Sequence, residues 1–126
     1  MENNQILQLS KTFALRIINM ADYLFKNYPH NRVVDVLGKQ VLRSGTSICA
    51  NISESENAQS TNDFISKLNI ALKEADETKV WLELLHESNY LTSASFESIY
   101  DDNEKIRAIL IKIIKSLKNK KENDGK

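Results

Sequence analysis

Residues 61–88, TNDFISKLNIALKEADETKVWLELLHES, carry the clearest helical pattern of the chain. Apolar and small side chains recur there at alternating steps of four and three residues, which places them on one face of an α-helix. They are Phe64, Leu68, Ala71, Ala75, Thr78, Leu82 and Leu85. Ser60, Thr61 and Asn62 offer side chains that cap a helix, and Asp63 lies near the positive end of its dipole. We therefore predict a long helix with one buried face that begins near Thr61.

Three further stretches also carry stripes whose members are three or four residues apart. The first stripe is Ile6, Leu9, Phe13, Ile17, Met20 and Leu24, the second is Val34, Leu37, Val41, Ser44, Ile48 and Ile52, and the last is Phe96, Ile99, Asn103, Ile106, Leu110, Ile113 and Leu117. Pro29 disfavours helix at the residue before it, so a loop separates the first two stripes. With 3 Gly and 1 Pro in 126 residues, the chain has few other helix breakers. We predict helices over 4–28, 32–56, 61–88 and 94–120, followed by a polar C-terminal tail over 121–126.

Short connections between long helices determine the expected topology. A short loop cannot carry the chain back along the bundle, so consecutive helices pack antiparallel. The expected fold is all-α, an antiparallel up-down four-helix bundle that forms one domain over residues 1–126. Several large apolar residues lie outside the four stripes, and we expect them either to widen the core or to form an interface between copies. They are Ile18, Ile65, Trp81, Leu84, Ile109 and Ile114.

The charge of the chain is balanced overall but unevenly distributed. Lys+Arg and Asp+Glu both number 17. Residues 74–104 nevertheless carry nine acidic side chains against Lys79 alone, whereas residues 105–126 carry eight basic side chains against two acidic ones. The single cysteine cannot form an internal disulfide, and the sequence shows neither a leader pattern nor an apolar run long enough to span a membrane. We expect a cytoplasmic protein with no membrane partner.

The residues that catalysis or metal binding would need are sparse. Glu83 and His86 form one Glu-x-x-His pair, but a two-metal centre in a helical bundle needs that pair twice, and the other histidine, His30, lies in the proline loop. Cys49 is a small packing residue in our interpretation, with a reactive thiol as the alternative. No glycine-rich phosphate loop or zinc spacing occurs. We expect no enzyme, no catalytic residue, no cofactor, no metal and no small-molecule substrate.

The most unusual stretch surrounds Arg43. Ser44, Ser47, Asn51 and Glu54 follow at helical spacing and form a polar row, and on the third helix Glu74 and Glu77 share one face. We predict that these residues, with Arg43, form a structural polar cluster across the bundle. Two glycines in the same helix are each unfavourable by about 1 kcal/mol relative to alanine. We read Gly38 and Gly45 as sites of close approach by another helix, and the alternative is that they lie on a solvent face.

These positions also carry a resemblance to a known family. The motifs are Arg43-Ser44, Ser47-Ile48, Asn51-Ile52 and Glu54, then Asp63-Phe64, Leu68, Ile70-Ala71-Leu72, Glu74, Glu77-Thr78 and Trp81-Leu82-Glu83-Leu84. In them the chain resembles the small four-helix bundle proteins encoded by intervening sequences within bacterial 23S ribosomal RNA genes. The resemblance implies a left-handed up-down bundle, a homo-oligomer in the form of a pentamer ring, and an unsettled biochemical role.

A more distant resemblance is to the accessory proteins of diversity-generating retroelements, which are pentameric bundles that bind nucleic acid and a reverse transcriptase. Those proteins are strongly basic, and the neutral charge of this chain departs from that pattern. Two function hypotheses follow. The first is a non-enzymatic, oligomeric interaction or scaffold protein. The second is a nucleic-acid-binding accessory protein that uses the basic end of an oligomeric ring, through Lys112, Lys115, Lys118, Lys120 and Lys121.

Overall fold

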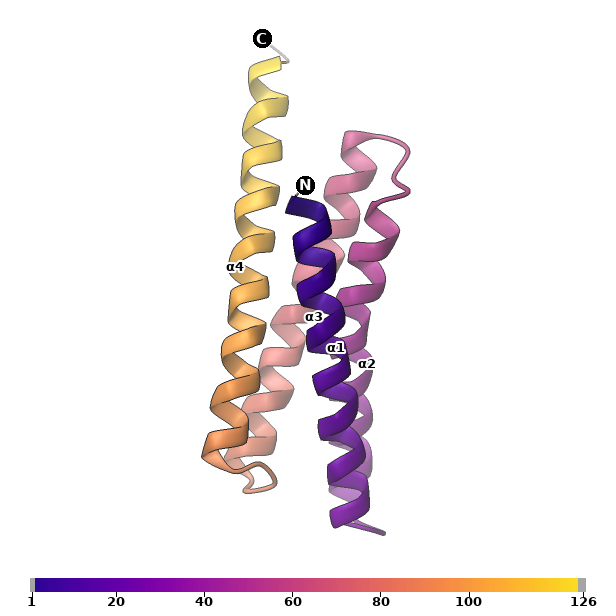
Figure 1. Cartoon of the computed structure of the whole chain (residues 1–126), viewed down its shortest axis with the longest axis vertical. Coiled ribbons are helices and arrows are strands. Elements are labelled where there is room, and N and C mark those ends of the chain that lie inside the picture. The colour runs from indigo at the N-terminus through magenta and orange to yellow at the C-terminus, as the bar shows by residue number, and fades with distance from the viewer. Residues whose placement is uncertain (1, 125–126) are drawn as a thin grey trace.

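Four long helices make up a computed structural model of the protein, which describes residues 2–124, with side chains from residue 5 onward. They are α1 (Glu2–Asn27), α2 (Arg32–Ser55), α3 (Thr61–Glu87) and α4 (Ser93–Asp124). Consecutive helices run in opposite directions, and each helix packs on its neighbours in chain order, with α4 closing back on α1 (Figure 1). The predicted all-α, antiparallel four-helix bundle is confirmed.

Side-chain caps begin the helices after each turn. The Asn31 side chain accepts a hydrogen bond from the backbone N–H of Val34 at 3.0 Å, and Ser60 accepts one from Asp63 at 3.0 Å. These caps satisfy backbone donors that have no partner inside a helix. In the turn after α3, Asn89 has a φ of 69°, a left-handed conformation that asparagine tolerates better than most residues.

The last helix is longer than the sequence pattern predicts. α4 continues to Asp124, past the predicted end at residue 120, so residues 121–124 are helical rather than a tail. Nothing in the sequence before Gly125 breaks a helix, and its lysines suit the negative end of the helix dipole. Residues 125 and 126 of the predicted tail lie outside the described residues. The final turns of α4 extend beyond the ends of the other helices (Figure 1).

The core follows the predicted stripes with some exchanges of position. Leu9, predicted inside, keeps 45% of its surface exposed, whereas Ser10 beside it is fully buried. Of the apolar residues outside the stripes, Ile65 and Ile114 belong to the core, while Ile18 and Leu84 remain exposed. The remaining two, Trp81 and Ile109, are half-buried at the edge of the core.

Both glycines of α2 lie against α1. A Cβ atom at Gly38 would stand 2.6 Å from the ring of Phe25, and one at Gly45 would stand 2.9 Å from the side chain of Ile17. Both distances are shorter than van der Waals contact. The close approach expected from the sequence therefore occurs inside the bundle, and the solvent-face alternative is wrong. It also means that these glycines do not support an interface between copies.

Candidate functional site

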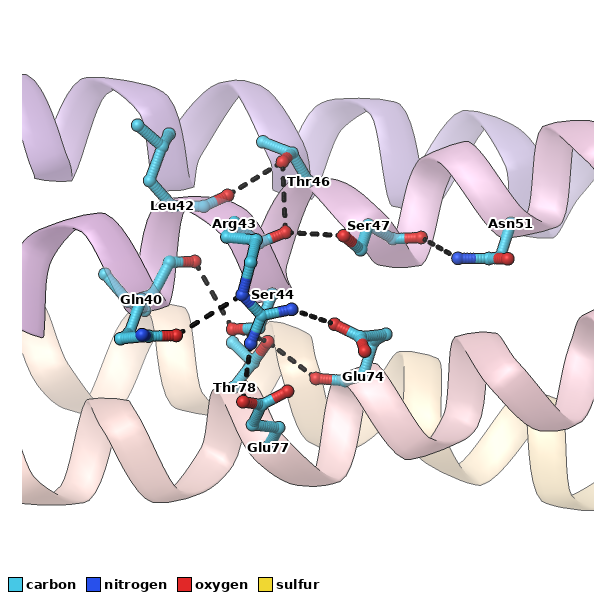
Figure 2. A network of polar contacts seen from close by, with 11 residues as sticks. Gln40, Leu42, Arg43, Ser44, Thr46, Ser47, Asn51, Glu74, Glu77 and Thr78 are labelled. Atoms are coloured by element: carbon cyan, nitrogen blue, oxygen red, sulfur yellow. Dashed lines mark hydrogen bonds and ion pairs between the residues drawn. The ribbon is translucent and has the colours of Figure 1, made fainter.

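A polar cluster joins the middle of α2 to the middle of α3 (Figure 2). Arg43 on α2 contacts two carboxylates on α3: its Nη1 lies 3.1 Å from Oε2 of Glu74, and its Nη2 lies 2.5 Å from Oε1 of Glu77. The Nε of Arg43 donates to Oε1 of Gln40 at 3.3 Å. Because Glu74 and Glu77 are three residues apart on one helix, a single planar guanidinium spans both. The structure thus brings together three of the residues predicted to form the cluster.

This ion cluster lies at the surface of the bundle. The Arg43 side chain keeps 48% of its surface exposed, against 17% for Glu74 and 36% for Glu77. Exposed ion pairs contribute only about 0.2–1 kcal/mol each to stability. A guanidinium fork is nevertheless directional, so the cluster favours one alignment of α2 along α3.

A buried hydroxyl pair lies directly beneath the ion cluster. The hydroxyls of Ser44 and Thr78 are hydrogen bonded at 2.8 Å, and both residues are fully buried. The Thr78 hydroxyl also lies 2.8 Å from the carbonyl oxygen of Glu74, one turn earlier on α3. Ser44 belongs to the predicted cluster. Because it is fully buried, its contact with α3 lies inside the bundle.

Among the described residues, the side chains of the other predicted members of the cluster form no hydrogen bond or ion pair with the Arg43 guanidinium or with its two carboxylates, and they bond elsewhere. Ser47 donates to the carbonyl of Arg43 at 2.7 Å, and Asn51 donates to the carbonyl of Ser47 at 2.9 Å. Both bonds stay within α2, because a short polar side chain reaches the carbonyl one turn back. Glu54 lies at the end of the row, where its Oε1 is 3.5 Å from Nζ of Lys67 on α3.

Arg43 and Glu77 each keep the other charged. The hydrogen bond from Arg43 holds the pKa of Glu77 below its usual range, although partial burial opposes this effect. The hydrogen bond to Glu77 in turn raises the pKa of Arg43, again against partial burial. A pair in which both members stay ionised near neutral pH has no proton to exchange with a substrate. The arrangement is therefore suited to holding two helices together rather than to acid–base chemistry.

Two further arginine clusters join α4 to its neighbours, and the sequence analysis missed both. Arg16 on α1 forms an ion pair with Asp102 on α4, and its Nη2 donates to the hydroxyl of Ser98 at 2.8 Å. On the opposite side of α4, the Nε of Arg107 lies 2.6 Å from Oδ1 of Asp76 on α3. Each of these arginines contacts a neighbouring helix, as Arg43 does.

The Glu-x-x-His pair on α3 is engaged with α4 instead of facing other carboxylates. Glu83 accepts a hydrogen bond from the hydroxyl of Tyr100 at 2.9 Å. Burial, followed by that bond, raises the pKa of Tyr100 to about 12. His86 stacks on Phe96 with ring centroids 4.2 Å apart. Within the described residues, no group of three or more His, Cys, Asp or Glu side chains is placed to hold a metal ion.

A cleft of about 690 Å³ opens between α1 and the turn that joins α3 to α4. Arg16 contributes a cationic group, His86 contributes an imidazole ring, and Tyr23, Tyr28 and Tyr90 contribute aromatic walls. Arg16 is already paired with α4, and Nε2 of His86 lies 3.2 Å from the Ser93 hydroxyl. The cleft therefore has the volume of a ligand site, but the Arg16 guanidinium and the His86 ring already have partners.

The lysines predicted to contact nucleic acid lie together on the final turns of α4. All of them are exposed: Lys112, Lys115, Lys118, Lys120 and Lys121. Lys121 also contacts the side chain of Asn62 at the start of α3. Across residues 2–124, no helix is both long and apolar enough to cross a membrane.

Comparison with known proteins shows which family this bundle represents. A crystal structure of a protein of unknown function from the S23 ribosomal protein family of Bacteroides thetaiotaomicron matches it with a TM-score of 0.85 and 50% sequence identity. The match covers 91% of this chain and 99% of the other. No curated protein matches the chain. The family model described as 23S rRNA-intervening sequence protein matches residues 2–112. The chain therefore belongs to the 23S rRNA-intervening sequence protein family.

Proposed function

We propose that the protein is a non-enzymatic, homo-oligomeric interaction or scaffold protein of the bacterial cytoplasm. The observation that carries this proposal is the amount of apolar surface left exposed on a well-packed bundle. Large apolar side chains with at least 41% of their surface exposed occur on all four helices. They are Leu9, Leu15, Ile18, Tyr23, Val33, Val36, Ile70, Val80, Leu84 and Ile111.

The arrangement of these side chains supports contact with other copies. Single exposed apolar residues are normal, but neighbours on one face indicate an interaction surface. Leu15 and Ile18 are one turn apart on α1, and Val80 and Leu84 are one turn apart on α3. Contacts between different faces of identical subunits produce a closed ring when the rotation closes. The family resemblance implies five subunits, and we propose a pentamer.

Light scattering after gel filtration tests this proposal. We expect the full chain at micromolar concentration to have a mass that is a multiple of the 14.4 kDa monomer, five-fold for the proposed ring. Replacing Leu15 and Ile18 with serine is expected to lower the mass if α1 contributes to the ring. A monomeric wild-type protein under these conditions contradicts the proposal.

A second candidate function is binding of nucleic acid at the basic end of α4. The observation that favours it is the exposure of five lysines on the last turns of α4, a helix whose final turns extend beyond the other helices (Figure 1). Repeated around a ring, such an end gains affinity through multivalency. The neutral charge of the whole chain makes this the weaker candidate.

A further inference from the structure

A regular row of side chains runs along the outward face of α4. Its members recur at alternating steps of three and four residues, the spacing of a helix that packs lengthwise against another helix. They are Ala94, Glu97, Asp101, Glu104, Ala108, Ile111, Lys115, Lys118 and Glu122. We call this set the outer row. All its members are exposed except Glu104, which is half-buried. Because α4 packs only on α3 and α1 among the described helices, the outer row faces no other described helix.

Charge is sorted along the outer row. Three carboxylates lie in its first half, an alanine and an isoleucine lie in its middle, two lysines follow, and Glu122 ends the row. The central isoleucine, Ile111, keeps 45% of its surface exposed. Among the side chains that the structure describes, no ion pair involves Glu97, Asp101, Lys115 or Lys118. These four charges therefore remain available to a partner.

A helix whose first half is acidic and whose second half is mainly basic is complementary to a reversed copy of itself over most of its length. In an antiparallel pair, the alternating row aligns so that Ala108 of each copy faces Ile111 of the other. In the same alignment, Asp101 faces Lys118, and Glu104, which also forms an ion pair with Arg107 of its own helix, faces Lys115. Glu97 faces Glu122, so one of the three kinds of charged contact is repulsive. Each of these contacts occurs twice, because the two copies are related by a two-fold axis. A parallel pair would instead place like charges side by side.

We propose that two copies of this chain associate through the outer rows of their α4 helices, antiparallel, with the two-fold axis passing between Ala108 and Ile111. This inference rests on the proposed function only in taking the partner to be another copy, and it adds a surface and an orientation. One helix pair buries less than the roughly 1,200–2,000 Å² typical of stable interfaces. The contact is therefore weak, and salt weakens it further because its charges are exposed.

Cross-linking of paired alanine-to-cysteine variants tests the orientation. Ala108 and Ala94 both belong to the outer row, and neither substitution removes a charge. Each is made in the full chain with Cys49→Ala, so that the introduced thiol is the sole one. At 1.5 Å rise per residue, the two residues at position 108 are separated by about 5 Å along the helix axis, and the two at position 94 by about 46 Å.

A short bismaleimide that bridges the interaxial distance of about 8–10 Å is the probe. We expect Ala108→Cys to give a covalent dimer on a denaturing gel and Ala94→Cys to give none. Cross-linking at both positions would show a parallel contact, and cross-linking at neither would show that the α4 helices do not meet. Either result overturns the proposal.

Charge reversal tests the predicted pairs. In the Ala108→Cys chain, Asp101→Lys alone and Lys118→Asp alone are each expected to slow cross-linking about fivefold, because each change disrupts two exposed ion pairs. Both changes together restore the pair with its signs exchanged, and the rate should recover. Lys39→Asp on α2, which does not contact α4, is the control for a change in net charge. Failure of the double variant to recover overturns the assigned pairs.

These outcomes are distinguishable from failure of the proposed ring. If the ring exists without the α4 contact, the wild-type mass exceeds that of a dimer and Ala108→Cys gives no cross-link. If the α4 contact exists without the ring, the mass does not exceed that of a dimer and the cross-link forms. If the partner is an acidic or basic protein instead of a second copy, the isolated chain would show neither a mass above the monomer nor a cross-link. That result also overturns the inference.

Discussion

At the scale of single residues, the glycines of α2 determine how closely α1 packs on that helix. The atom nearest to a Cβ at Gly38 belongs to the ring of Phe25, which is half-buried. The atoms nearest to a Cβ at Gly45 belong to Ile17, which is fully buried. A buried, β-branched side chain has little freedom to move aside. The two glycines are therefore expected to differ in their tolerance of a methyl group.

We expect Gly45→Ala to lower the free energy of unfolding by about 1 kcal/mol, because overpacking by about 1–3 kcal/mol outweighs a helix-propensity gain of about 1 kcal/mol. Gly38→Ala should lower it less, since the ring of Phe25 can rotate outward. Urea unfolding followed by circular dichroism measures both. An increase in the stability of Gly45→Ala would contradict the close packing of Ile17.

Residue identities predicted part of the polar cluster and missed the rest for definite reasons. Arg43, Glu74 and Glu77 were foreseeable because their spacing puts them on faces of consecutive helices. The pairing of Asp76 with Arg107 could also have been predicted, because both residues lie at similar distances along the chain from the turn between α3 and α4. The pairing of Arg16 with Asp102 was not, because α1 and α4 are joined by no direct connection that sets their relative height.

At the scale of helices, the cluster around Arg43 acts between α2 and α3. The hydrogen bond from Arg43 favours the ionised form of Glu77, which loses this interaction when it is protonated. A carboxyl group with a lowered folded-state pKa stabilises the protein above its unfolded pKa, and that contribution disappears as the pH falls through the folded value. The effect of Glu77 therefore belongs to the acid range, below its ordinary pKa of 4.5.

We expect Glu77→Gln to be less stable than the wild type at neutral pH, with the difference narrowing as the pH falls below about 4.5. Urea unfolding between pH 7 and pH 3 measures this. Glu87→Gln, at an exposed carboxylate on the same helix, controls for the loss of a negative surface charge. A difference that stays constant to pH 3 would show that Arg43 does not stabilise ionised Glu77.

The helices themselves were largely predictable, and their ends less so. Apolar residues spaced three or four apart predicted four helices, because this spacing follows directly from 3.6 residues per turn. The spacing did not predict every buried residue. Ser10 lies in the core, where Leu9 was expected, because a helix that packs on two neighbours buries more than one line of side chains. The end of α4 escaped prediction because polar composition by itself does not stop a helix.

At the scale of the whole molecule, charge is arranged along the long axis. The acidic segment surrounds the turn between α3 and α4, and the basic segment ends at the far tip of α4 (Figure 1). Such a charge distribution suits contacts between reversed copies and also suits a polyanion at the basic tip. The lysines outside the outer row separate these two uses, because they take no part in the proposed antiparallel contact.

We expect weak, sequence-independent binding of nucleic acid at low salt, falling steeply as salt rises because phosphate contacts release counterions. Replacing Lys112, Lys120 and Lys121 with glutamine should reduce both the affinity and the salt slope in fluorescence anisotropy. Lys11→Gln with Lys39→Gln and Lys73→Gln, at exposed lysines on other helices, is the matched control. A dissociation constant of about 10⁻⁸ M at physiological salt would make nucleic-acid binding the leading function.

The seam between α1 and α4 has a consequence for the order in which the bundle opens. These helices pack together less extensively than the other neighbours, and the cleft beside Arg16 interrupts their contact. Regions with few buried contacts exchange their amide hydrogens through local opening, whereas better-packed regions exchange only when the whole domain unfolds. Hydrogen–deuterium exchange should therefore be slowest in the middle of α2 and α3. The first and last helices would then separate from each other while α2 and α3 remain packed as a central hairpin. The side of the bundle that opens most readily is therefore the side formed by the first and last helices of the chain.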